Sequence, residues 1–150
     1  MKKIDWTQFK KGAMLVNVLG IIYDRENDKI LIGRRENDPY LEKLTWSFPG
    51  GRPGYEDELE IYLKKTVKEK TGLEVEVGDV IFSKTYPEKR EFLSIYYLVN
   101  IIGGEERVGG SFKELKWVSP AELEDYFTED ESEELIAILI LGFYCMLGLL

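Results

Sequence analysis

Apolar and polar positions along the chain predict a series of strands separated by polar turns. Residues 13–23, AMLVNVLGIIY, are apolar and β-branched, which is typical of a buried strand. The polar turn DRENDK follows, and the alternating segment KILIGRR at residues 29–35 predicts the second strand of a hairpin. A short aromatic strand is expected at residues 44–49, LTWSFP. Further strands are expected at residues 74–86, 92–102 and 112–118.

Between these strands, residues from about Asp57 to Thr71 have the pattern of an amphipathic helix. Acidic side chains crowd its beginning, where the helix dipole favours negative charge, and lysines crowd its second half. Gly72 supplies the C-terminal stop. The apolar stripe that must pack on the sheet consists of Leu59, Tyr62, Leu63 and Val67. The turn that precedes the helix is built from Pro49, Gly50, Gly51, Pro53 and Gly54.

Two more helices are expected near the C-terminus. The sequence Ser119-Pro120-Ala121-Glu122 has the form of a capping box and predicts a short helix. No charged residue occurs in the final run LIAILILGFYCMLGLL, which is shorter than the ~20 residues of a membrane span. We therefore expect an apolar helix at about 131–150 that packs on the domain or forms a homodimer. A membrane tail is the alternative.

The order of strands, helix, strands and helix predicts an α+β fold, an α/β/α sandwich with a mixed sheet. A chain of 150 residues has the size of one domain, so we expect a single domain over residues 1–150. The net charge is −8, from 28 acidic and 20 basic residues, which argues against binding of nucleic acid or anionic membranes. A small phosphate ligand in a local basic pocket is compatible with this charge.

The cysteine and histidine counts restrict the chemistry. Cys145 is the only cysteine, so no intrachain disulfide can form, and a reducing cytoplasm is the expected compartment. Histidine is absent from the sequence, which excludes His-based triads and His-containing zinc sites. Acid–base or metal chemistry must therefore rest on carboxylates, which suit Mg²⁺, Mn²⁺ or Ca²⁺.

One face of the predicted central helix is a candidate for chemistry. Thr66, Glu69 and Lys70 are spaced i, i+3 and i+4, so they share a face, and Lys65 lies beside it. The preceding glycine turn delivers backbone N–H groups nearby. In the absence of a chemical role, Thr66 is expected to be an ordinary helix-surface residue.

Residues 51–73 resemble the Nudix box. The pattern of that family is Gly, five residues, Glu, seven residues, Arg-Glu-aliphatic, one residue, Glu-Glu, one residue, Gly-aliphatic. Asp57 stands at the first Glu, and the matching residues are Gly51, Val67, Glu69, Gly72 and Leu73. The segments KILIGRR, WSFPGGR and FKELKWVSPAEL resemble other features of the family, so the likeness covers about residues 13–127.

The resemblance implies a set of site residues. In Nudix hydrolases the box glutamates bind Mg²⁺ or Mn²⁺ and help to activate the water that attacks a diphosphate. Glu69 and Asp57 are then the candidate catalytic and metal-binding residues, and further candidate metal ligands are Glu56, Glu105 and Glu106. The candidate substrate-binding residues are Gly50, Gly51, Arg34, Arg35, Arg52, Lys65 and Lys70. A base-stacking residue is sought among Tyr40, Trp46, Tyr86 and Tyr96, with the sheet core as the alternative. For the charged residues the alternative is solvated surface charge.

The chain also departs from the family pattern, so its Nudix box is degenerate. Lys65 replaces the arginine, and Thr66 and Lys70 replace glutamates. An ammonium at position 70 would repel a divalent cation, and loss of the metal would remove most of the rate enhancement. We therefore expect a Nudix-fold protein whose hydrolysis of a nucleoside diphosphate linked to another group is weak or lost. The alternatives are a protein that binds a nucleotide-like ligand without turnover, and a purely structural role.

Overall fold

The computed structural model describes residues 12–36, 46–86 and 89–127, with isolated positions before residue 12. The apolar helix expected at about 131–150 lies outside the described residues, and so does Tyr40. Within the described part of the chain, no helix has the length and apolar character needed to cross a membrane. All charged residues and glycines of the predicted site fall within the described ranges.

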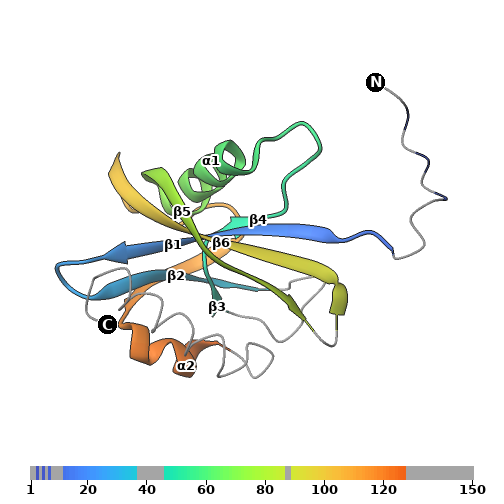
Figure 1. The fold of residues 1–150 in the computed structure, drawn as a ribbon. Helices are drawn as coiled ribbons and strands as arrows, with labels where there is room; N and C mark the ends of the chain where they lie inside the picture. The colour runs from blue at the N-terminus through green and yellow to red at the C-terminus, as the bar shows by residue number, and fades with distance from the viewer. Residues whose placement is uncertain are drawn as a thin grey trace.

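Seven strands form one mixed sheet (Figure 1). They are β1 (Leu15–Asp24), β2 (Lys29–Arg35), β3 (Trp46–Ser47), β4 (Gly50–Gly51), β5 (Leu73–Tyr86), β6 (Lys89–Gly104) and β7 (Phe112–Val118). The main order is β3-β2-β1-β6-β5, while β4 pairs with β1 and β7 pairs with β2. β1 and β6 are parallel and the other pairs are antiparallel, which confirms the predicted mixed sheet and the β1–β2 hairpin.

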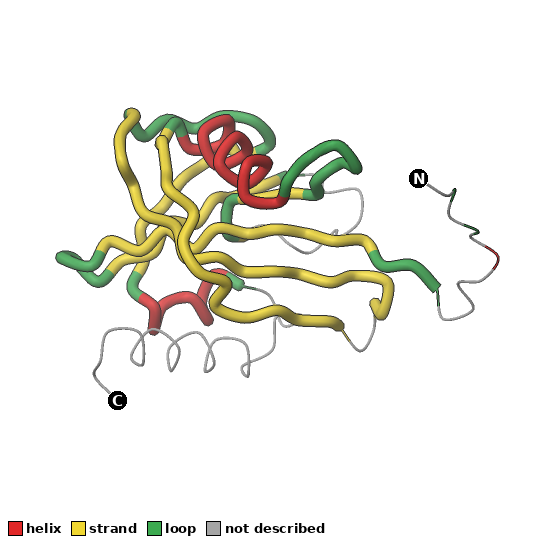
Figure 2. The backbone as a smooth tube through the Cα atoms, turned by 45° about the horizontal axis from the view of Figure 1, so that its top comes forward, coloured by secondary structure: helices red, strands yellow, loops and turns green. Residues whose placement is uncertain are grey.

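Helices lie on both faces of this sheet, as the α/β/α prediction requires. Helix α1 (Leu59–Thr71) covers one face, and the 3₁₀ segment η2 (Pro120–Glu122) with α2 (Leu123–Tyr126) lies on the other (Figure 1). Figure 2 shows α1 resting over the long strands. Side chains alternate between the two faces along each strand, and this alternation divides the core into two clusters.

The cluster beneath α1 confirms the predicted apolar stripe of the helix. Leu63 and Val67 are fully buried there, and Leu59 and Tyr62 pack against the cluster. Their partners from the sheet are Val18, Ile22, Leu31, Leu73, Val75, Tyr97 and Val99. The cluster beneath α2 contains Ile21, Ile30, Ile32, Phe48, Tyr96, Val118, Leu123 and Phe127. Neighbouring strand residues such as Leu31 and Ile32 therefore face opposite helices.

Two predicted helix starts need correction. α1 begins at Leu59 rather than at Asp57, because Asp57 closes a turn in which its Oδ2 accepts the N–H of Gly54 at 3.1 Å. Ser119 stands at the N-cap of η2 as expected, but its side chain makes no capping hydrogen bond, so the capping box is wrong. The N–H of Glu122 donates instead to the backbone carbonyl of Ser119 at 2.9 Å, as 3₁₀ geometry allows.

Candidate functional site

The side chain of Lys70 turns into the protein from the last turn of α1. Its Nζ donates to the carbonyl oxygen of Gly50 at 2.5 Å and lies 5.3 Å from the centre of the Phe112 ring. That ring is buried and covers Gly33 in β2, where a Cβ atom would lie 2.3 Å from ring atoms. The ammonium therefore lies where α1, β4 and the beginning of β7 meet.

Thr66 is buried, with 5% of its surface exposed, so its interpretation as a helix-surface residue is wrong. The reason is that β4 packs over this part of α1. A Cβ atom on Gly51 would lie 3.7 Å from the Cγ2 of Thr66 and 2.4 Å from the hydroxyl oxygen of Tyr62. Glu69, by contrast, is exposed, so the predicted chemical face is divided between buried and solvated positions.

The loop between β6 and β7 docks on the C-terminal end of α1 (Figure 2). The N–H of Arg107 donates to the carbonyl of Thr71 at 2.7 Å, and the N–H of Gly109 donates to the carbonyl of Lys70 at 3.1 Å. These bonds satisfy carbonyls that have no partner within the helix. The close approach depends on glycine, because a Cβ on Gly109 would lie 2.2 Å from the Glu69 carbonyl oxygen.

This docked loop carries the candidate metal ligands Glu105 and Glu106. Both are exposed, and the carboxylate of Glu106 accepts a hydrogen bond from the Nε1–H of Trp117 at 2.5 Å. The hydrogen bonds of the loop place its backbone at the end of α1 that also holds Glu69, while the Glu106 carboxylate is bonded to Trp117.

Asp57 and Glu56 lie at the other end of α1, in the turn before the helix. A helix of 13 residues is about 20 Å long, so these carboxylates and Glu69 are too far apart to bind one ion together. Among the residues that the structure describes, no three Asp, Glu, Cys or His side chains form a group placed to hold a metal ion. Asp57 instead stabilises the local turn through Gly54.

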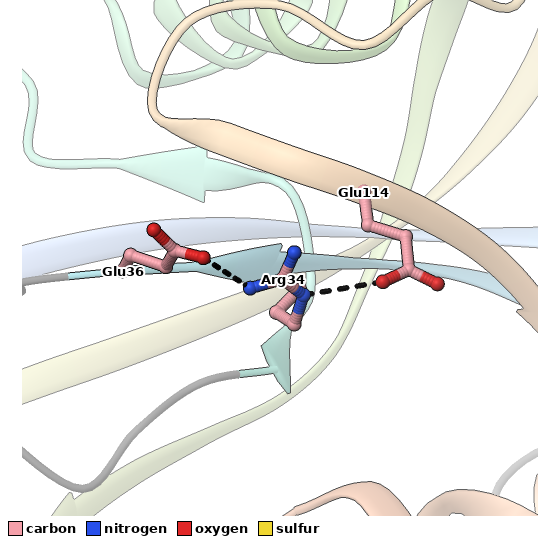
Figure 3. Close-up of polar contacts among 3 residues, drawn as sticks. All are labelled: Arg34, Glu36 and Glu114. Atoms are coloured by element: carbon pink, nitrogen blue, oxygen red, sulfur yellow. Dashed lines mark hydrogen bonds and ion pairs between the residues drawn. The ribbon is translucent and has the colours of Figure 1, made fainter.

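Arg34 is held between two carboxylates (Figure 3). Its Nη1 donates to Glu36 at 2.6 Å, and its Nε donates to Glu114 in β7 at 3.1 Å. The hydrogen bond to Glu36, followed by that to Glu114, raises the pKa of Arg34 above its ordinary value. The same contact lowers the pKa of Glu36. Arg34 follows Ile32 by two residues and therefore lies on the α2 face of the sheet, away from Lys70.

The remaining candidate cations also separate by face. Arg35 pairs with Phe112 across the β2–β7 ladder and shares its face with Gly33, so it lies on the Lys70 side, with its Nε buried. The guanidinium of Arg52 lies 5.5 Å from the Phe92 ring centre, and Phe92 alternates onto the α2 face. Lys65 is exposed on α1. Of these cations, Lys70 lies over the Phe112 ring, and Arg35 is the one that pairs with Phe112 in the β2–β7 ladder.

The candidate base-stacking aromatics belong largely to the core beneath α2. Tyr96 is 1% exposed and stacks on Phe82, with ring centres 4.3 Å apart. Trp46 packs edge-on against Tyr126 at 5.3 Å. The hydroxyl of Tyr86 lies 2.9 Å from Ser94 Oγ and 3.3 Å from the Tyr96 hydroxyl. These contacts agree with the sheet-core alternative for Trp46 and Tyr96.

Phe112 is a functional candidate that the sequence reasoning missed. Its ring forms one wall around the Lys70 ammonium. The available signal was Gly33 inside the alternating strand KILIGRR, because a glycine within a strand often marks a close approach by another group. The sequence offered no means of naming the aromatic residue that makes this approach, which lies 79 positions further along the chain.

Comparisons with known proteins agree with the fold. A family model described as the NUDIX domain matches residues 14–137. The chain is 30% identical over 105 residues to the ADP-ribose pyrophosphatase of Methanocaldococcus jannaschii, an alignment that covers 68% of this chain and 60% of that relative. The chain therefore spans less than two thirds of that relative's length.

Solved structures show the same fold. An ADP-ribose pyrophosphatase from Streptococcus suis is similar with a TM-score of 0.64 at 22% identity, over 83% of this chain and 87% of that chain. The MutT protein from Methanosarcina mazei Go1 is similar with a TM-score of 0.70 at 16% identity, over 85% of this chain and 94% of that chain. At these identities the likeness concerns the fold alone.

Proposed function

The chain belongs to the Nudix family, and on this premise we propose that it binds a nucleoside diphosphate linked to a second group and hydrolyses it weakly or not at all. Members of the family act on nucleotide-like substrates and generally use divalent metals. The names of the two ADP-ribose pyrophosphatases make ADP-ribose the first ligand to test. If hydrolysis occurs, Mg²⁺ or Mn²⁺ is the expected cofactor.

The contact between Lys70 and Gly50 carries this proposal. An ammonium bonded to the turn carbonyl places a positive charge at the position where the family pattern has a metal-binding glutamate. A divalent cation brought into contact with this ammonium would be repelled by it. Thr66, the second replaced glutamate, is packed under β4 and carries no charge.

The donor set of the described residues does not fit a divalent cation held in the family manner. Glu69 is the remaining carboxylate at this end of the helix, and the docked loop adds the exposed Glu105 and Glu106. Mg²⁺ prefers rigid octahedral oxygen ligation, often through one or two carboxylates and substrate phosphates. We therefore assign no reaction step to a metal, and keep Glu69 as the candidate ligand if turnover is found.

The same contact favours a second function, which is binding without turnover. Lys70 and Arg35 are two cations on one face, both beside Phe112. Cations of this kind bind phosphate oxygens well, whereas an ammonium or guanidinium cation has no lone pair with which to take a proton from water. A regulatory or ligand-sensing protein would keep this binding surface and lose the hydrolysis.

Turnover is tested with a panel of nucleoside diphosphate derivatives, beginning with ADP-ribose, in Mg²⁺ or Mn²⁺, with phosphate-containing products measured. We expect the native protein to turn over far below the ~1 s⁻¹ of ordinary enzymes. The double variant Thr66→Glu, Lys70→Glu is assayed beside it, with Lys70→Glu alone as a second variant because position 66 is buried. Turnover by the native protein at ~1 s⁻¹ or more would refute weak hydrolysis.

Binding is measured separately by isothermal titration calorimetry with the same ligands. A native protein that binds ADP-ribose or a related diphosphate without turnover supports the second function. A native protein that neither binds nor cleaves any member of the panel contradicts both functions and leaves the structural role.

We further propose, from the single cysteine, that the protein works in the cytoplasm. From the apolar sequence of the C-terminal run, we propose that residues from about 131 to 150 mediate a homodimer. Sedimentation with and without residues 135–150 tests the second point. Loss of the dimer on truncation agrees with the proposal. A truncated protein with the same oligomeric state as the full chain contradicts it.

A further inference from the structure

The ammonium of Lys70 is enclosed by groups that suit a cation. The Gly50 carbonyl accepts its hydrogen bond, and the face of the Phe112 ring lies 5.3 Å away. A carbonyl oxygen is a common ligand of hard cations, and an aromatic face attracts cations through its quadrupole. The position therefore has the electrostatic character of a cation site that a side chain of the protein itself fills.

The stem of Lys70 is held as closely as its head. The docked loop passes beside it, because a Cβ on Gly110 would lie 3.1 Å from Lys70 Cγ. The backbone of Lys70 also accepts a hydrogen bond from the N–H of Gly109. The side chain is consequently fixed along its length by α1, by the turn at Gly50 and by the loop.

We infer that Lys70 is a tethered replacement for a divalent cation, so that a phosphate-bearing ligand binds at this site without any metal. This inference rests on the proposed function for the identity of the ligand. Arg35, the partner of Phe112 in the β2–β7 ladder, adds a second cation to this part of the sheet. The Lys70 ammonium is tethered to α1, so its presence does not depend on metal concentration.

Reversing the charge at position 70 should make the protein require a metal ion. In Lys70→Glu the carboxylate faces the Gly50 carbonyl and the Phe112 ring, both of which repel an anion. A divalent cation between the new carboxylate and the carbonyl removes this repulsion. The variant should therefore acquire a requirement for metal that the native protein lacks.

The first arm of the test needs no ligand. Thermal unfolding is followed in EDTA and in millimolar Mg²⁺ or Mn²⁺ for the native protein, Lys70→Glu and the control Lys64→Glu. Lys64 is exposed on the same helix, so the control makes the same charge change at the surface. We expect metal to raise the Tm of Lys70→Glu by about 3 °C or more. The difference in Tm between the native protein and the control Lys64→Glu should be the same in EDTA and in metal.

The second arm measures ADP-ribose binding by calorimetry, again with EDTA or with Mg²⁺. The native Kd should be the same in both conditions within about threefold, and Lys70→Glu should lose about tenfold or more in EDTA and recover in Mg²⁺. Lys70→Met, which keeps the stem and removes the charge, should bind weakly in both conditions. It is the second variant if Lys70→Glu does not fold.

The outcomes separate the inference from the proposed function. Native binding that appears only with metal overturns the inference and leaves the proposed binding function intact. The inference is also overturned if metal raises the Tm of the native protein and of Lys64→Glu, and raises that of Lys70→Glu by no more. If ADP-ribose does not bind at all, the ligand assignment fails, and the Tm arm still decides whether Lys70 replaces a cation.

Discussion

Replacing Gly72 by alanine tests how firmly the loop after β6 is docked on α1. Gly72 has a φ of 75°, a left-handed conformation that costs a residue with a Cβ about 1 kcal/mol. The alanine Cβ would lie 2.1 Å from the Glu105 carbonyl oxygen and 3.1 Å from the Arg107 nitrogen. Both neighbours are backbone atoms, so the substitution forces the loop itself to move.

The size of the effect follows from the contacts that the movement breaks. The hydrogen bonds from Arg107 to Thr71 and from Gly109 to Lys70, at 2.7 and 3.1 Å, hold the loop in place. Each contributes about 1 kcal/mol. Added to about 1 kcal/mol for the left-handed backbone, their loss lowers the free energy of unfolding by about 3 kcal/mol.

Equilibrium urea denaturation followed by circular dichroism measures this loss as a shift of the midpoint at constant slope. Gly72→Asn separates the two causes, because asparagine accepts the left-handed conformation but still has a Cβ. We expect it to retain most of the loss. Gly54→Ala is the control, since its Cβ meets only the Asp57 side chain, at 3.4 Å. If Gly72→Asn is as stable as the native protein, the docking argument is refuted.

Three further predictions concern other parts of the structure. Lys68 donates to Glu74 at 2.6 Å and lowers the pKa of Glu74. The stabilisation from this pair is therefore present above the usual carboxyl pKa and should fade as the pH falls below it. Burial, followed by the charge of Glu60, raises the pKa of Tyr97, so stability should decline as pH rises above the usual tyrosine range. Gly33→Ala should cost about 1–3 kcal/mol through overlap with the Phe112 ring, and Phe112→Leu in the same chain should recover part of it.

Each of these has its own control. Urea midpoints of the native protein and Glu74→Gln, compared across acidic pH, should converge, and a constant difference contradicts the pairing. Tyr97→Phe should lose less stability than the native protein at alkaline pH, where phenolate absorbance follows the ionisation of tyrosine. An unchanged dependence of stability on pH contradicts the burial argument. For Gly33→Ala, strictly additive effects with Phe112→Leu contradict direct contact, because touching residues couple by about 0.5 kcal/mol or more.

The local pattern of the sequence was sufficient for the elements and the family. The alternation in KILIGRR, the apolar stripe of α1 and the stop at Gly72 depend on interactions within a few residues, and the structure confirms all three. Helix starts were less certain, as α1 shows, because the side chain of Asp57 serves the preceding turn rather than the helix. Such competition between a turn and a helix cannot be resolved from residue types alone.

The tertiary structure alone decided which way the candidate site residues point. Strand alternation places Arg34 on the face opposite Lys70, and contact with the Phe92 ring takes the Arg52 guanidinium to that face as well. The packing of β4 buries Thr66. The sequence established that an ammonium replaces a carboxylate at position 70. Whether that ammonium faces solvent or the turn depends on contacts with Gly50 and Phe112, which lie 20 and 42 positions away along the chain. Long-range packing sets those contacts, and no local pattern records them.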